Sequence, residues 1–134
     1  MAKTVAIIVA RLIFAGVFAM AAWFKFTAMQ GTAEHIAAVG FPIPLVLAWL
    51  AAVFEVALVI AFLTGLYFRA AALLAAAYVV FLAFAFHGVS HWAGNQAEFG
   101  SFVDHFTFTA GLLFAAIHGP GNAMVVRVRG FAPQ

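Results

Sequence analysis

The chain has 134 residues, of which 68% are hydrophobic and only 7% are charged, whereas a soluble domain carries roughly 25% charged residues. Because so few charges cannot cover a water-soluble globule, the composition predicts one small domain surrounded mainly by lipid. The net charge of +2 comes from six dispersed basic residues, which form neither the patch nor the stripe that nucleic-acid binding requires. The lack of cysteine excludes disulfides, thiolate metal ligands and iron–sulfur clusters, so redox chemistry would need a borrowed cofactor.

The apolar N-terminal segment is expected to be a membrane span rather than a cleaved signal peptide. Its apolar run is longer than the roughly 7 to 15 residues of a signal-peptide core, and Arg11 interrupts it. We therefore count this segment as the first of the predicted spans.

Four apolar segments follow one another along the chain, at residues 4–26, 44–64, 68–88 and 102–118. Each is long enough to cross a hydrocarbon core about 30 Å thick as a helix that rises about 1.5 Å per residue. The segments are continuously apolar and lack the alternation of a transmembrane β-strand, which excludes a β-barrel. The sequence predicts an all-α fold, a single transmembrane domain over residues 1–134 that forms an integral membrane four-helix bundle.

The first and third connections are the longer ones. In the first, Thr32 is expected to cap a short interfacial helix that runs through Val39 and ends at Gly40. The third connection, residues 89–101, is polar and carries Trp92, a residue typical of the headgroup level.

The basic residues predict the orientation of the spans, because cytoplasmic connections carry an excess of Lys and Arg. With a cytoplasmic N-terminus, only Lys25 lies outside, and four basic residues lie inside. These four are Lys3, Arg69, Arg127 and Arg129. We expect both termini to be cytoplasmic, with the two longer connections facing outward.

Two ionisable residues are expected deep within the spans, away from their ends, where charges are costly and usually face protein or a wet cavity. Glu55 lies about 16 Å into the hydrocarbon core, on a helix face with small residues such as Ala48 and Ala52. Arg11 is expected at a similar depth on the first span, so we predict that the two side chains meet. One interpretation is a buried ion pair that only fixes packing. The other is a proton-active carboxylate.

A second polar layer is expected at the outer end of the spans. Asp104 shares a helix face with Gly111 and Ala115, whose small side chains predict that this face packs against a neighbouring helix. We expect the layer to border a partly wet cavity. Its four ionisable residues are Lys25, His87, Asp104 and His105.

His87 and His91 stand four residues apart, a spacing that places two imidazoles on one helix face and recurs in metal sites. Gly88 follows His87 directly, and two histidines without a fixed carboxylate indicate a metal only weakly. We therefore assign no metal site, and keep a metal at His87 and His91 as an alternative to interfacial histidines bonded to water or carbonyls.

Several short motifs, in this order and on four spans, resemble the DoxX-like family of small bacterial membrane proteins over about residues 7–122. The residues that carry the resemblance are Arg11, Lys25, Gly40-Phe41-Pro42-Ile43-Pro44, Glu55, Gly65, Arg69-Ala70-Ala71, His87 and Gly119-Pro120-Gly121. The resemblance implies a multi-pass protein of the bacterial inner membrane. The family's namesake is the small membrane subunit of a thiosulfate:quinone oxidoreductase. Other relatives are linked to quinone or redox-stress handling, and more distant ones act as cargo receptors or chaperones.

Two classes of function follow. In the first, the chain is a membrane subunit of a quinone oxidoreductase, and a protein partner supplies the electrons. Protons are moved by Glu55, His87, Asp104 and His105. The quinone is held by Arg11 and Lys25. In the second, the chain is a non-enzymatic assembly or scaffold subunit of a larger membrane complex. Fold-level resemblance alone does not choose between them.

Overall fold

The structure is a computed structural model that describes residues 1–126. Arg127 and Arg129, which the orientation prediction uses, lie outside the described residues. The regular structure of the described part is entirely helical, with no strand, as predicted. Its elements are α1 (Ala2–Thr27), α2 (Met29–Ala38), α3 (Pro44–Thr64), α4 (Phe68–His87), the 3-10 turn η1 (Val89–His91) and α5 (Gln96–His118).

Within the described residues, four helices, α1, α3, α4 and α5, are long and apolar enough to cross a membrane. This confirms the four predicted spans. The second span has the predicted bounds, whereas α5 begins at Gln96, before the expected start at residue 102. The reason is a helix cap, because the Asn95 side chain accepts a hydrogen bond from the Glu98 backbone N–H at 3.4 Å.

The predicted cap of the short helix is wrong. α2 begins at Met29, and Thr32 lies inside it, where its hydroxyl donates to the Ala28 carbonyl at 3.1 Å. A hydroxyl engaged with the preceding turn does not serve the N–H groups that a cap must satisfy. The predicted end is confirmed, since Gly40 adopts a φ of +85°, which glycine tolerates best.

The described chain divides into two compact units, and each is described by itself. Unit 1 contains Met1–Tyr67 and the described residues from Pro120 onward, and unit 2 contains Phe68–Gly119. The single domain over residues 1–134 and the cytoplasmic position of both termini stay predictions.

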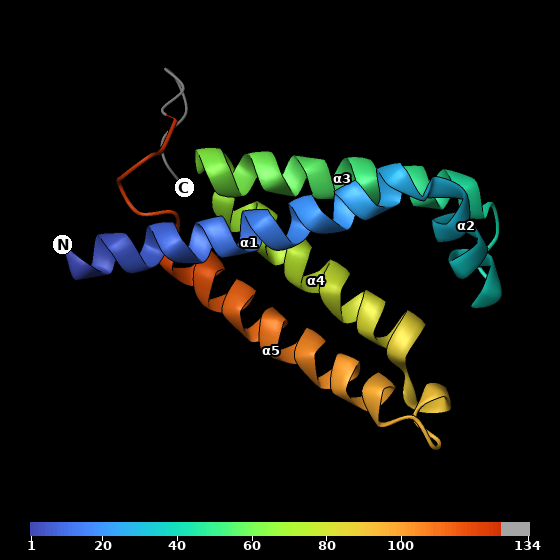
Figure 1. Ribbon diagram of the computed structural model, residues 1–134. Coiled ribbons are helices and arrows are strands. Elements are labelled where there is room, and N and C mark those ends of the chain that lie inside the picture. The colour runs from blue at the N-terminus through green and yellow to red at the C-terminus, as the bar shows by residue number, and fades with distance from the viewer. Residues whose placement is uncertain (127–134) are drawn as a thin grey trace. The chain divides into compact units, whose positions relative to one another are not determined.

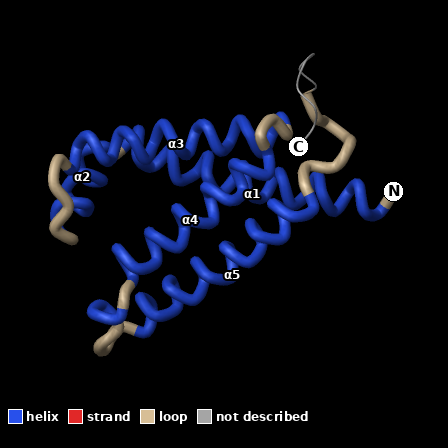
Figure 2. The backbone as a smooth tube through the Cα atoms, turned by 180° about the vertical axis from the view of Figure 1, so that it is seen from behind, coloured by secondary structure: helices blue, strands red, loops and turns tan. Residues whose placement is uncertain are grey.

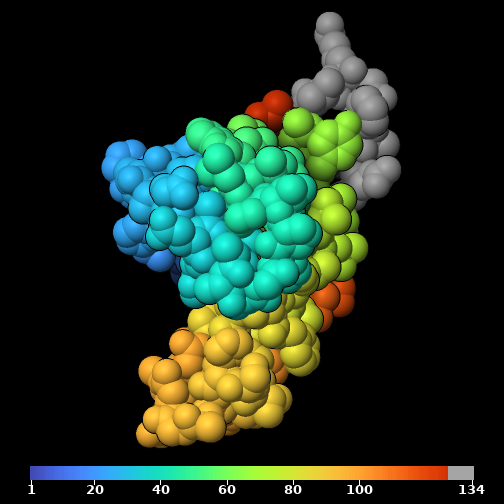
Figure 3. All heavy atoms as spheres, turned by 90° about the vertical axis from the view of Figure 1, so that its right-hand side faces the viewer, coloured from blue at the N-terminus to red at the C-terminus, as the bar shows by residue number. Residues whose placement is uncertain are grey.

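In unit 1, α1 and α3 lie side by side, and α2 packs against α3 (Figures 1 and 2). The side chains of α2 and of the start of α3 form a continuous surface in the space-filling view (Figure 3). The Phe62 ring lies 5.4 Å from that of Phe14 and 5.9 Å from that of Phe18, and the Phe26 ring lies 5.8 Å from that of Trp49. The start of α1 is thus beside the end of α3, and the two helices are antiparallel.

In unit 2, α4 and α5 form a second antiparallel pair, joined through η1 (Figure 2). Arg69, at the start of α4, bonds to Ala116 near the end of α5, and His87, at the end of α4, bonds to Glu98 near the start of α5. Unit 2 is therefore a helical pair with polar contacts at both ends.

Candidate functional site

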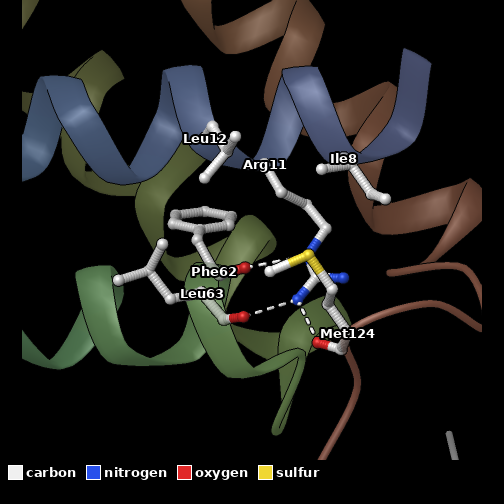
Figure 4. A pocket seen from close by; sticks show the side chains of 6 residues that line it. All are labelled: Ile8, Arg11, Leu12, Phe62, Leu63 and Met124. Carbon is white, nitrogen blue, oxygen red and sulfur yellow. Dashed lines mark hydrogen bonds between the residues drawn. The ribbon is translucent and has the colours of Figure 1, made fainter. Parts of the chain in front are cut away.

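Arg11 on α1 is almost fully buried, at 3% exposure, and is surrounded by backbone carbonyls (Figure 4). Its Nε donates a hydrogen bond to one carbonyl, and Nη1 and Nη2 donate to two carbonyls each. The donor–acceptor distances are 2.7 to 3.2 Å. All five N–H groups of the guanidinium are thereby used. The accepting carbonyls belong to Phe62, Leu63, Pro120, Ala123 and Met124.

The carbonyl cage around Arg11 has a simple physical origin. The last carbonyls of a helix lack partners within that helix and carry the negative end of its dipole. Arg11 satisfies two of them at the end of α3, Phe62 and Leu63, and ties the segment that contains Met124 to the same point. This buried cation thus stabilises the backbone where two parts of unit 1 meet.

A small pocket adjoins the Arg11 side chain (Figure 4). Apart from Arg11 its walls are apolar, and the guanidinium donates every N–H to the backbone. The pocket therefore offers a ligand no free N–H from Arg11, and a role for Arg11 in holding a quinone stays a prediction. The lining residues are Ile8, Arg11, Leu12, Phe62, Leu63 and Met124.

Glu55 on α3 is 1% exposed, so it faces protein as predicted, but its cationic partner is Lys25. Lys25 Nζ lies 2.8 Å from Glu55 Oε1, and the lysine side chain is 19% exposed. Ala48 and Ala52, on the same side of α3, are fully buried. The pair thus combines a carboxylate inside unit 1 with an ammonium group that reaches its surface.

The predicted pair of Arg11 with Glu55 is wrong, and the register of the two helices explains why. Arg11 bonds to Phe62 and Leu63, so it lies level with the end of α3. Glu55 lies about 10 Å away along that helix. Arg11 is held there by its carbonyls, whereas Lys25 extends its long side chain from the last turn of α1 to the carboxylate.

In unit 2, His87 is the centre of a polar cluster. Its Nδ1 lies 2.6 Å from Glu98 Oε2, and its ring centre lies 5.0 Å from that of His105. The side chains of His87 and Glu98 are 25% and 31% exposed. Trp92 donates its indole N–H to the His87 carbonyl at 2.8 Å and so holds the end of α4. Two imidazoles and one carboxylate thereby meet at a half-exposed end of the unit.

Sequence reasoning missed Glu98 because it placed this residue in a connection. Once α5 is known to begin at Gln96, Glu98 and His105 stand two helical turns apart and share one face. The missing signal was Asn95, a good N-cap residue three positions before Glu98.

Asp104 lies off the most buried face of α5, and Gly111 and Ala115, which share its face, are only partly buried. The packing of that face against a neighbouring helix stays a prediction. Asp104 is exposed, whereas Thr109, Leu112 and Ala116 are buried and follow His105 at helical spacing. Successive side chains on a helix point about 100° apart around its axis. His105, rather than the preceding Asp104, therefore points to His87. Lys25 belongs to unit 1 and the other members of the expected outer layer to unit 2, so the wet cavity stays a prediction.

His91 does not join His87 in a site. α4 ends at His87, and His91 lies in η1, exposed, with Nδ1 3.3 Å from the Ser90 hydroxyl. The predicted spacing holds only within a continuous helix, and Gly88 has an extended conformation that ends it. Across residues 1–126, no group of three or more His, Cys, Asp or Glu side chains is placed to hold a metal ion.

Comparison with known proteins agrees with this arrangement of apolar spans and polar residues. The chain matches the DoxX family over residues 6–88, a range that contains Arg11, Lys25, Glu55 and His87. The chain belongs to the DoxX family. It is also similar to the inner membrane protein YqjF of Escherichia coli strain K12, with 32% identity over 129 residues, which cover 94% of this chain and 93% of the relative. No solved structure matches.

This DoxX protein is a multi-pass protein of the inner membrane, and the lipid bilayer is its environment. Glu98 and His105 lie beyond the residues that match the family, so the polar cluster of unit 2 is only partly covered by the match.

Proposed function

We propose that this DoxX protein binds a lipid-soluble quinone beside the Lys25–Glu55 pair and handles the protons of its reduction, while a protein partner supplies the electrons. The observation that carries the proposal is the 2.8 Å contact between Lys25 Nζ and Glu55 Oε1, in a pair whose glutamate side chain is 1% exposed and whose lysine side chain is 19% exposed. Ionisable residues at membrane depth are costly and often functional.

The chemistry of a quinone explains why such a pair would be useful. Reduction to a quinol takes up two electrons and two protons, and negative charge develops on the ring oxygens. The Lys25 ammonium group has three N–H donors, of which one is directed to Glu55. Another can donate to a quinone oxygen and stabilise its developing charge. Glu55 then exchanges protons with Lys25, and both protons come ultimately from water.

The electrons must come from another protein. The chain has no cysteine for a dithiol or an iron–sulfur cluster, so an electron-donating cofactor held by a partner is required. The resemblance to a family whose namesake is a subunit of a quinone oxidoreductase supports this arrangement. Roles for His87, Asp104 and His105 in proton transfer stay predictions.

The alternative is a non-enzymatic assembly or scaffold subunit. One observation favours it: Arg11 and Arg69, although ionised, hold only backbone carbonyls. Charged side chains therefore serve packing at two places, at the buried Arg11 and at the exposed Arg69, and the Lys25–Glu55 pair would be a third.

Quinone binding by the purified full chain separates the two functions. We would titrate the protein in detergent with a short-chain ubiquinone and quantify quinones that co-purify. Lys25→Met and Glu55→Gln should each weaken binding by more than about tenfold, which corresponds to one lost charge-assisted hydrogen bond. Lys3→Met and Glu34→Gln remove the same charges at exposed positions and should leave binding unchanged.

The double variant Lys25→Met/Glu55→Leu guards against a simple loss of folding. Replacing both partners of a buried pair by apolar residues is often nearly neutral for stability, so this variant should stay folded and yet fail to bind quinone. Binding as tight as that of the wild type in the folded double variant would overturn the proposal and leave the scaffold function.

A further inference from the structure

Two imidazoles in unit 2 each have one ring nitrogen engaged and the other available. His87 Nδ1 lies 2.6 Å from Glu98 Oε2, and His105 Nδ1 lies 2.7 Å from the Ser101 carbonyl. A carbonyl only accepts, so His105 carries its proton on Nδ1, and the same holds for His87 beside a carboxylate. Neither Nε2 takes part in a hydrogen bond within residues 1–126, and in the neutral ring each Nε2 has a lone pair.

This pattern is the one that metal-binding histidines show. A histidine that binds a metal through one nitrogen almost always donates the other N–H to a carboxylate, a backbone carbonyl or water. His87 has the carboxylate of Glu98 in this role, and His105 has the carbonyl of Ser101. Both ring orientations are thus fixed before any ligand arrives.

The distance between the two rings agrees with a shared ligand. Their centres lie 5.0 Å apart, and the ring planes are tilted by 47°. Two imidazoles that bind one tetrahedral ion through nitrogens at about 2.1 Å have ring centres about 5 Å apart. Imidazoles on opposite sides of one metal ion, as in a bis-histidine haem, would have ring centres more than about 6 Å apart. The separation of the ring centres is therefore the one expected for two adjacent positions of one small coordination sphere.

We propose that His87 and His105 bind one divalent transition-metal ion through their Nε2 atoms, with Glu98 as the residue that orients His87. Imidazole ligands select Zn²⁺, Cu²⁺ or Ni²⁺ over Mg²⁺ and Ca²⁺, which require oxygen ligands. His87 is 25% exposed, so water completes the coordination. The site is independent of the quinone proposal, which rests on residues of unit 1.

Direct metal binding tests the inference. The full chain, purified in detergent with a tag that contains no histidine, is titrated with Zn²⁺ by calorimetry and with Cu²⁺ by electron paramagnetic resonance. We expect one ion per chain and hyperfine coupling from two imidazole nitrogens. His87→Gln and His105→Gln should each weaken binding more than about tenfold, and Glu98→Gln about tenfold, the usual effect of losing an orienting residue.

His91→Gln is the matched control, because His91 is exposed and close in sequence, and its Nδ1 contacts the Ser90 hydroxyl. It should leave the affinity and the two-nitrogen signal unchanged. An unchanged affinity in His105→Gln, or an equal loss in His91→Gln, would overturn the site. The assay contains no quinone, so its outcome is separate from that of the quinone titration.

Discussion

The two units share one arrangement of helices and charged residues but differ in the polar groups that it presents. Each contains an antiparallel helical pair in which an arginine in the first half of one helix holds carbonyls at the end of the other: Arg11 at the end of α3 and Arg69 at the end of α5. Farther along each pair a basic side chain from the last turn of a helix meets a carboxylate, in Lys25–Glu55 and in His87–Glu98.

The difference between the units lies in burial and in the type of base. Unit 1 has a carboxylate at 1% exposure with an ammonium partner, which has donors and no lone pair to offer. Unit 2 has a half-exposed carboxylate with imidazoles, which have lone pairs. The comparison teaches that similar helical pairs present different chemical groups, because the base and its exposure differ; our proposals assign proton donation to the first unit and metal binding to the second.

The largest expected effect distinguishes the two arginines. Arg11→Met leaves five carbonyls without their donor, so we expect unfolding to become easier by at least about 4 kcal/mol. Arg69→Met removes a single nitrogen that donates to two carbonyls, Ala116 and Ile117, and should cost about 1 to 2 kcal/mol. Thermal unfolding in detergent measures both, and equal losses would contradict the difference between the units.

The next effect concerns the partner of Glu55. Lys25→Met should lower stability by about 3 kcal/mol, because it leaves the buried Glu55 without its charge partner. Glu55→Gln should cost less, because Lys25 is partly exposed. The double variant should recover much of the loss. A cycle of Arg11→Met with Glu55→Gln is the control and should be additive, because these side chains do not meet. Strong coupling in the control cycle would show that Arg11 contacts Glu55 after all.

The smallest effect tests the end of α5 in unit 2. Gly119 has a φ of +75°, and a Cβ there would lie 3.2 Å from Arg69 Nη2. Gly119→Ala should therefore cost about 1 to 2 kcal/mol. Gly100→Ala lies within α5 with open space around it, and should be neutral or stabilise by about 0.5 to 1 kcal/mol. Equal changes in stability for the two variants would show that neither the positive φ of Gly119 nor the nearby Arg69 side chain disfavours a Cβ at this position.

Much of the architecture could be predicted because it depends on local sequence. Apolar runs of the right length give helices in lipid, where the backbone must satisfy its own hydrogen bonds. The bounds of α3 and the protected position of Glu55 follow from such patterns. The start of α5 was missed because the cap at Asn95 was overlooked in a polar stretch.

The contacts of the ionisable residues depend on more than local sequence. The sequence by itself determined that Arg11, Lys25 and Glu55 lie within or at the ends of spans, and that a charge there must face protein. Only the tertiary structure decided that Lys25, rather than Arg11, reaches Glu55, and that His105 faces His87. The physical reason is register: each residue moves a side chain by about 1.5 Å along a helix and about 100° around it. Pairing is therefore decided by how two helices align, which neither helix specifies alone.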